Sequence, residues 1–327
     1  MSATLDSGTA GPTAGSGTAT GSGTAAGGPA SGPARTRPYD RPQVGIWLAV
    51  VQPDDLVGFA QRAEQAGCDS LWVPEHLIWP AELASPYPYR TDGGAPVPSD
   101  VLLYDPWVLL GAVATVTTRI KLGTCVYVLP LRDPLVTARA VATLDVMSRG
   151  RAVLGAGLGW MREEFDAVGI DFRSRGERCD EIVPVLRSLW SEELTSASGR
   201  HVNFEPLHMN PKPPQGAGLP IVFGGESQAA LRRAARLGDG WLGTWHDVES
   251  TRAVTGRLED LLIEHGRAGS PFEVTVMISP RIMSTELIDQ LWRAGADRIC
   301  IGSPRAPLSL WPDILNRLAK IIAELAT

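Results

Sequence analysis

A histidine follows a short apolar segment at a position suited to proton transfer. The segment spans residues 70–73, and His76 comes shortly after it, directly behind Glu75. An imidazole titrates near neutral pH, so a histidine beyond a buried strand can give or take a proton. Neighbouring residues of an extended segment point in opposite directions, which makes Glu75 the weaker of the two. We name His76 and Glu75 as candidate catalytic residues; the alternative for His76 is an ordinary surface histidine.

Alternating glycines follow a second apolar segment. Beyond residues 152–154 the chain reads Gly155-Ala156-Gly157-Leu158-Gly159-Trp160, and an acidic stretch with Glu163 comes next. Main chain without a Cβ can approach a flat or charged group closely. The third glycine is too early for a dinucleotide-binding fingerprint. The pattern therefore favours a ligand-binding rim, with glycines that only allow close packing as the alternative.

A third apolar segment ends in Gly224-Gly225-Glu226-Ser227, where a helix is expected to begin. The first N–H groups of a helix and the positive end of its dipole attract an anion without any lysine. Ser227 is also a good N-cap residue, which would by itself explain the serine. Both roles are compatible.

Apolar segments and amphipathic segments alternate along the chain from residue 43 onward. The expected strands are 44–50, 70–73, 120–128, 152–156, 220–223, 240–243, 273–278 and 298–301. The expected helices are 53–66, 106–117, 134–147, 176–190, 227–237, 250–266, 284–294 and 308–325. Eight strands, each followed by a helix, predict an α/β fold of the (β/α)8 TIM-barrel type, with a doubly wound sheet as the alternative. Two insertion loops, 74–105 and 191–218, are rich in proline and glycine and are typical of lids or binding loops.

Composition separates a tail from the barrel and excludes several partners. Residues 1–34 consist almost entirely of Ser, Thr, Gly, Ala and Pro, so we expect a disordered tail over 1–40 and a barrel over 41–327. The formal net charge of −6 argues against nucleic-acid binding. The chain has no apolar run of membrane-spanning length and no secretory start, and its four cysteines are far apart. We therefore expect a cytoplasmic protein without a metal site or a membrane partner.

Four segments together resemble one known family. They are Leu122-Gly123-Thr124-Cys125-Val126, the run from Leu144 to Arg151, the glycine stretch from Gly155 to Phe165, and Gly224-Gly225-Glu226-Ser227 running on to Trp241. In this order they are similar to the luciferase-like monooxygenase superfamily, in particular its branch of oxidoreductases that use the deazaflavin coenzyme F420. The resemblance covers roughly residues 42–325, which is everything except the tail.

The resemblance implies a cofactor site at the rim of the barrel. In that family the third strand carries a bulge with a non-proline cis peptide behind the cofactor ring, the glycine stretch lies beside the ring, and the later glycine turn holds the phosphate. A histidine at the position of His76 lies against the reactive face, and the family implies a homodimer. The cofactor-binding residues carried over are Thr124, Cys125, Val126, Gly157, Gly159, Trp160, Glu163, Gly224, Gly225, Glu226 and Ser227.

Trp160 stands where some sugar-phosphate-oxidising members have a glutamate that exchanges a proton. Indole cannot exchange a proton, so we expect hydride transfer between F420 and a small unsaturated or carbonyl substrate instead. The alternatives are a monooxygenase that uses FMN and a barrel that binds flavin or deazaflavin without turnover. The sequence leaves the substrate and the direction of hydride transfer open.

Overall fold

The computed structural model describes residues 34–48, 53–97, 99, 102–303 and 308–326. The disordered tail expected at the start of the chain lies mostly outside the described residues. The described residues form one compact unit.

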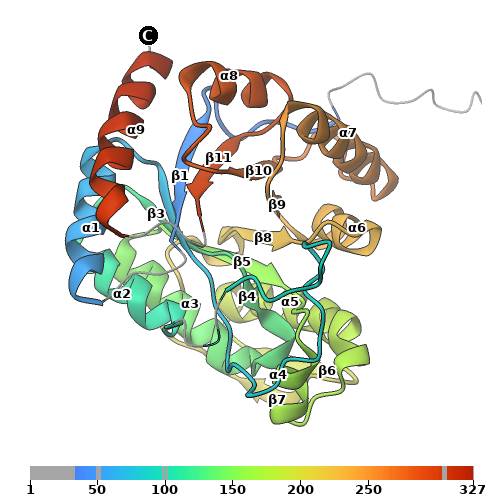
Figure 1. Cartoon of the computed structure of the whole chain (residues 1–327). Coiled ribbons are helices and arrows are strands. Elements are labelled where there is room, and N and C mark those ends of the chain that lie inside the picture. The colour runs from blue at the N-terminus through green and yellow to red at the C-terminus, as the bar shows by residue number, and fades with distance from the viewer. Residues whose placement is uncertain (1–33, 49–52, 98, 100–101, 304–307, 327) are drawn as a thin grey trace, which may run out of the picture. The chain divides into compact units, whose positions relative to one another are not determined.

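Parallel strands close into a barrel, as the sequence predicts. Around it the order is β3, β2, β1, β11, β10, β9, β8 and β5, and pairing of Leu122 with Ala152 joins β3 back to β5. In the described residues these eight strands have the bounds β1 Gln43–Trp47, β2 Ser70–Val73, β3 Lys121–Thr124, β5 Ala152–Gly157, β8 Ile221–Gly224, β9 Gly240–Gly243, β10 Glu273–Ile278 and β11 Arg298–Gly302. The architecture is therefore the TIM-like barrel (Figure 1).

Helices follow the strands and cover the outside of the barrel (Figure 1). They are α1 Pro53–Gln65, α2 Pro106–Val116, α3 Pro134–Ser148, α4 Arg162–Ala167, α5 Arg175–Ser191, α6 Gln228–Leu237, α7 Val248–Glu264, α8 Thr285–Arg293 and α9 Trp311–Leu325. Local sequence explains several starts: Asp105 and Asp133 accept main-chain N–H groups ahead of a proline in the first turn. Among the described residues, none of the helices combines the length and apolarity that crossing a bilayer requires.

The structure differs from the sequence prediction in three places. The strand expected over 120–128 is divided into β3 and a short β4 (Tyr127–Val128), which pairs with β5. The expected loop 191–218 contains an antiparallel hairpin, β6 Thr195–Ser198 and β7 Asn203–Leu207. The short helix α4 was not predicted. The described part of 74–105 contains no helix or strand before α2.

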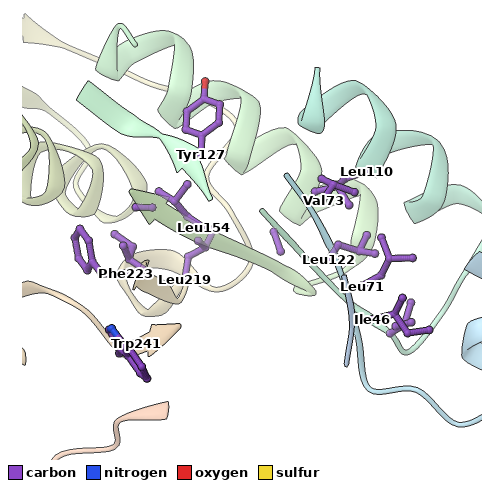
Figure 2. Packing of buried hydrophobic residues seen from close by; sticks show 14 of the residues in the cluster. Ile46, Leu71, Val73, Leu110, Leu122, Tyr127, Leu154, Leu219, Phe223 and Trp241 are labelled. Atoms are coloured by element: carbon purple, nitrogen blue, oxygen red, sulfur yellow. The ribbon is translucent and has the colours of Figure 1, made fainter. Parts of the chain in front are cut away.

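Among the described residues, two of the apolar clusters lie against the barrel strands, one on each face. The larger lies between strands and helices; Figure 2 shows part of it, including Leu71, Leu122 and Leu154 from three neighbouring strands. The smaller cluster consists of Trp72, Val153, Val222, Leu242, Met277 and Cys300. The indole of Trp72 fits there because a Cβ on Gly123 would lie only 2.4 Å from it. Both faces of the strands are thus buried, as expected for a parallel barrel.

Residues shortly before β1 are fixed to the end of the barrel where the strands begin. The buried Arg35 and the half-buried Arg37 bind opposite carboxylate oxygens of Asp297, at 2.6 and 2.7 Å. The guanidinium of Arg37 also stacks 3.3 Å from the ring centre of Trp292. The sequence analysis had assigned these two arginines to the tail.

Candidate functional site

Most of the predicted site residues lie at the end of the barrel where the strands finish. His76 follows β2, Cys125 follows β3, Gly157 ends β5 and Gly224 ends β8. Catalytic groups of barrels of this kind come from this face. The fold therefore brings these predicted residues to one rim of the barrel, although their side chains make different contacts there.

The end of β3 forms the bulge that the family resemblance implies. The peptide bond between Cys125 and Val126 is cis, without a proline. The side chain of Thr124 is buried and bonds β5, donating to Gly155 O at 2.8 Å and accepting from Gly155 N at 3.0 Å. Burial raises the pKa of the Cys125 thiol to about 12, which fits the expected packing role and not a nucleophile.

Val126 projects from this bulge into the space between β5 and β8. A Cβ added to Gly157 would lie 2.3 Å from Val126 Cγ2, and one added to Gly224 would lie 2.7 Å from Val126 Cγ1. Such distances are far inside van der Waals contact, so only glycine fits opposite this valine. The glycines thus serve close packing, the alternative noted above; their contact with a cofactor stays a prediction.

His76 lies within ion-pair distance of a buried carboxylate. Its Nδ1 lies 3.0 Å from Oε2 of Glu164, and Oε1 of the same carboxylate accepts Leu77 N at 2.7 Å. Glu164 is fully buried, whereas the His76 side chain keeps 14% of its surface exposed. The imidazole also makes edge contacts with Trp79 and Trp160, at centroid distances of 5.3 and 5.8 Å. Glu164 lies within the stretch from Gly155 to Phe165 that carries the family resemblance, but the sequence analysis did not single it out.

Glu75 supports the bulge instead of facing the rim. Its Oε1 accepts Val128 N at 2.7 Å and its Oε2 forms an ion pair with Arg132. Burial raises the pKa of Glu75, against the opposing effect of the Arg132 guanidinium. With both oxygens engaged, Glu75 holds β4 in place, and we do not retain it as a catalytic candidate.

Glu163 is likewise engaged by the protein itself. Its Oε1 accepts the main-chain N–H groups of Ala84 and Ser85, at 2.8 and 2.9 Å. Burial opposes ionisation, but these hydrogen bonds prevail and lower the pKa of Glu163 to about 2. This carboxylate therefore anchors the insertion 74–105 to the start of α4. Direct contact of Glu163 with a cofactor stays a prediction.

The turn between β8 and α6 has the bare main chain that an anion site needs. Gly225 adopts φ +118°, and a Cβ there would lie 2.8 Å from Ala230 Cβ, so a side chain is excluded. Ser227 caps α6 by accepting Ala230 N at 3.2 Å. The helix dipole and its first N–H groups fit a phosphate at this turn. We call Gly224–Ser227 the anion turn.

Charges near the anion turn are mostly paired. Arg233 and Arg236 each form an ion pair with Asp180 at 2.6 Å, so both guanidinium groups already have a carboxylate partner within the protein. Glu226 accepts Thr244 N at 2.9 Å and lies 3.2 Å from His246 Nε2. The sequence analysis missed His246, although it follows β9 much as His76 follows β2.

A hollow of about 590 Å³ lies away from this rim, near the end of α5. It is lined by Ser191, Glu193, His208, Asn210 and Lys212. Lys212 Nζ donates to Leu189 O and His208 Nδ1 lies 2.8 Å from Glu193 O. These contacts cap α5 and hold the following segment, so we assign no function to this hollow.

Comparison with known proteins identifies relatives that cover most of the barrel or a part of it. The sequence profile of the family described as luciferase-like monooxygenase matches residues 31–311. An uncharacterized protein of Mycobacterium tuberculosis is 32% identical over 257 residues, 79% of this chain and 87% of that protein. An F420-dependent glucose-6-phosphate dehydrogenase of Kineococcus radiotolerans is 36% identical over 197 residues, 59% of this chain and 52% of the dehydrogenase.

A solved structure has the same fold at low sequence identity. An F420-dependent secondary alcohol dehydrogenase, in complex with an F420–acetone adduct, superposes with a TM-score of 0.70 and 19% identity. The match covers 87% of this chain and 99% of that one. At this identity the likeness establishes the fold alone.

Proposed function

Because the chain belongs to the luciferase-like monooxygenase family, we propose that it is an oxidoreductase that uses coenzyme F420. The reaction is hydride transfer between the deazaflavin and a small unsaturated or carbonyl compound. The observation that carries this proposal is one rim that combines the Val126 bulge, the anion turn and the His76–Glu164 pair. The 36% identity to a part of an F420-dependent dehydrogenase supports the choice of deazaflavin.

The residues at the rim fit such a cofactor. The anion turn would hold its phosphate through main-chain N–H groups, since Gly225 leaves no room for a side chain. Cys125 and Val126 would support the ring system, with Gly157 and Gly224 holding the bulge in place. When bound, a deazaflavin supplies two-electron hydride chemistry; the protein's part is placement and electrostatics.

Reduction of a carbonyl or an activated double bond requires a proton as well as a hydride. Nδ1 of His76 is held by Glu164, which leaves Nε2 as the atom that exchanges a proton with substrate. Trp160 lies edge-on to this imidazole and has no exchangeable acid or base function. His76 is therefore the proton donor in the proposed reaction, and Trp160 shapes the substrate side of the rim.

Two alternatives are tested by the same experiment. The first is an FMN-dependent monooxygenase of the same family, and the second is a barrel that binds a cofactor without catalysing a reaction. Reduced F420 and reduced FMN are added separately to the purified protein, and absorbance is followed with and without oxygen and with a panel of carbonyl and enone acceptors. Oxidation of F420 only when an acceptor is present supports the proposal. Oxygen-dependent oxidation of FMN would replace it with the first alternative, and binding without turnover with the second.

We further propose that the protein acts in the cytoplasm, as its widely spaced cysteines predict, and that it is a homodimer, as the family resemblance implies. Sedimentation equilibrium of the full chain tests this point. A mass near that of one 34.9 kDa chain at micromolar concentration would contradict it.

A further inference from the structure

The turn after β9 holds a tryptophan in an unusual backbone conformation, at the same rim as His76. Trp245 has φ +58°, in the left-handed region that a bulky residue rarely adopts. The residue is 46% exposed, so the described part of the protein leaves much of it uncovered. Backbone strain of this kind persists only where neighbouring contacts enforce it, and it is concentrated at ligand sites. The contacts around Trp245 therefore need an explanation.

Glu226 fixes the residues on both sides of Trp245. Its Oε1 accepts Thr244 N at 2.9 Å, and its Oε2 lies 3.2 Å from His246 Nε2. The imidazole of His246 also packs edge-on against Trp241, at a centroid distance of 5.3 Å. One carboxylate therefore holds the main chain ahead of Trp245 and the side chain behind it.

The elements on either side of this turn are also fixed. Trp241 Nε1 donates to Gly225 O at 2.8 Å, which connects β9 to the anion turn. Asp247 caps α7 by accepting Ser250 N at 2.8 Å, and Ser250 Oγ accepts Asp247 N at 3.0 Å. In the part of the chain that the structure describes, the Trp245 indole itself has no hydrogen bond and no aromatic or cation–π contact. The fold thus holds the backbone of this turn firmly and leaves its ring without such a partner.

The order of the strands places Trp245 across the rim from His76. In the closed order of eight strands, β9, which precedes Trp245, is four places from β2, which precedes His76. The bulge at Val126 lies to one side, between β5 and β8. Below the rim, Trp47 packs on the smaller apolar cluster, and its Nε1 donates to Cys125 O at 3.3 Å. Apolar side chains therefore close the middle of the barrel under this rim.

We infer that Trp245 is a specificity-determining residue whose indole contacts a flat, apolar ring of the substrate, and that Glu226 is its positioning residue. This inference rests on the proposed function. The Val126 bulge would support the cofactor ring, which leaves the rest of the rim, between His76 and Trp245, for the substrate. An indole gains most from contact with another flat ring, and the apolar side chains below offer no partner to a charged group. The site therefore favours aromatic or cyclic carbonyl compounds and enones over short acyclic ones.

The first test compares cinnamaldehyde with crotonaldehyde, two enals that differ only in a phenyl ring against a methyl group. In the F420-dependent reaction, Trp245→Ala should raise the KM of cinnamaldehyde roughly 2- to 10-fold, the equivalent of one aromatic contact. The kcat and the KM of crotonaldehyde should stay unchanged, and Trp245→Phe, which keeps a ring, should lie between. Ile263→Ala is the matched control, because it truncates another exposed apolar residue, in the last turn of α7. Equal changes of KM for the two enals would overturn the inference.

A second measurement does not depend on turnover. Protein labelled with 5-fluorotryptophan has ten fluorine resonances, one for each tryptophan, and Trp245→Phe identifies the resonance of Trp245. Cinnamamide, an unreactive analogue, is added with and without F420. It should shift the Trp245 resonance and leave that of Trp292, which stacks on Arg37 at the other end of the barrel, in place. A Trp245 resonance that stays in place, or that moves only with protein concentration, would overturn the inference.

Substitutions of Glu226 test its positioning role in the same spectra. Glu226→Ala should move the Trp245 resonance of the ligand-free protein and raise the KM of cinnamaldehyde as Trp245→Ala does. Glu226→Gln keeps an oxygen for Thr244 N and an amide for His246, so it should restore both values. An unmoved resonance in Glu226→Ala would exclude the positioning role.

The two proposals fail separately in these experiments. A shift of the Trp245 resonance with cinnamamide, in protein that does not oxidise or reduce F420, would refute hydride transfer and support the contact with Trp245. Turnover of F420 without that shift would refute the contact alone. Absence of both turnover and shift would refute both proposals.

Discussion

The contact between Val126 and Gly157 gives a prediction whose size follows from the structure. Replacing Gly157 by alanine places a methyl carbon 2.3 Å from Val126 Cγ2 and 3.2 Å from its Cβ. Gly157 is buried and β5 is paired on both sides. The strand therefore cannot move away freely, and the bulge must shift instead.

Overpacking of this kind costs about 1–3 kcal/mol in the free energy of unfolding. For a domain of this size we expect the midpoint of thermal unfolding to fall by roughly 2–10 °C. Val126→Ala removes both Cγ atoms of a half-buried side chain, at a cost of about 1 kcal/mol. In the double variant only the 3.2 Å contact between the two Cβ carbons remains, which small shifts accommodate.

The double variant should therefore be about as stable as Val126→Ala alone, with a coupling of at least about 1 kcal/mol between the two sites. Circular dichroism at one scan rate measures the four unfolding midpoints, and cofactor titrations show whether the bulge has moved. Gly111→Ala is the matched control, because no heavy atom lies within 4 Å of the added carbon in α2. That substitution should stabilise the protein by about 1 kcal/mol. Additive effects of the two substitutions would refute the packing of Val126 against Gly157.

Four further predictions address the site and its supports. His76→Ala should lower turnover at least about 100-fold with little change in cofactor Kd; unchanged turnover excludes proton transfer. Gly225→Val should weaken phosphorylated cofactors more than riboflavin, and equal binding would remove the anion turn from the site. Asp297→Asn removes the carboxylate that pairs with both Arg35 and Arg37, of which Arg35 keeps only Glu259 at 3.4 Å. It should lower the free energy of unfolding by about 3 kcal/mol in denaturant titrations; a loss below about 1 kcal/mol would contradict this. The pKa of Glu163 is lowered to about 2, so the carboxylate that accepts the amides of Ala84 and Ser85 stays ionised over the usual pH range. Hydrogen-exchange protection of these two amides, corrected for the intrinsic exchange rate, should therefore be constant above about pH 4.5 and decline only below it. A decline that begins near pH 6 would contradict this prediction.

The bounds of a strand could be predicted closely where the strand is a continuous apolar run bordered by glycines. The bounds of β9 and β10 agree with those expected from sequence, because burial on both faces leaves little room for polar residues. The hairpin of β6 and β7 could not be found this way. Its residues are largely exposed or half-buried, as in Asn203–Leu207, so its strands lack the apolar signal that marks the barrel.

Interactions between distant residues explain what sequence reasoning missed at the rim. His76 was singled out from its place after β2, but its partner Glu164 lies 88 residues away and is recognised only in space. The break between β3 and β4 likewise depends on glycines of β5 and β8, which leave space for the Val126 side chain. The glycine spacing was noticed, whereas the side chain that fills the space between those glycines was not.

Buried charges at the opposite end of the barrel show why a shifted pKa alone does not mark a site. The guanidinium of Arg298 is buried, lies 2.8 Å from Glu273 Oε1, and donates to Ser70 Oγ at 2.9 Å and to the Tyr39 hydroxyl at 2.8 Å. Burial, followed by the Glu273 carboxylate, raises the pKa of Tyr39. Yet each of these groups is bonded within the cluster, which leaves a ligand nothing to replace. At the rim, by contrast, the Glu164 pair fixes only Nδ1 of His76, and the turn at Gly225 presents main chain without a side chain. We therefore expect the chemistry at the end of the barrel where the hydrogen bonding of side chains is incomplete, and not at the end where charge is most deeply buried.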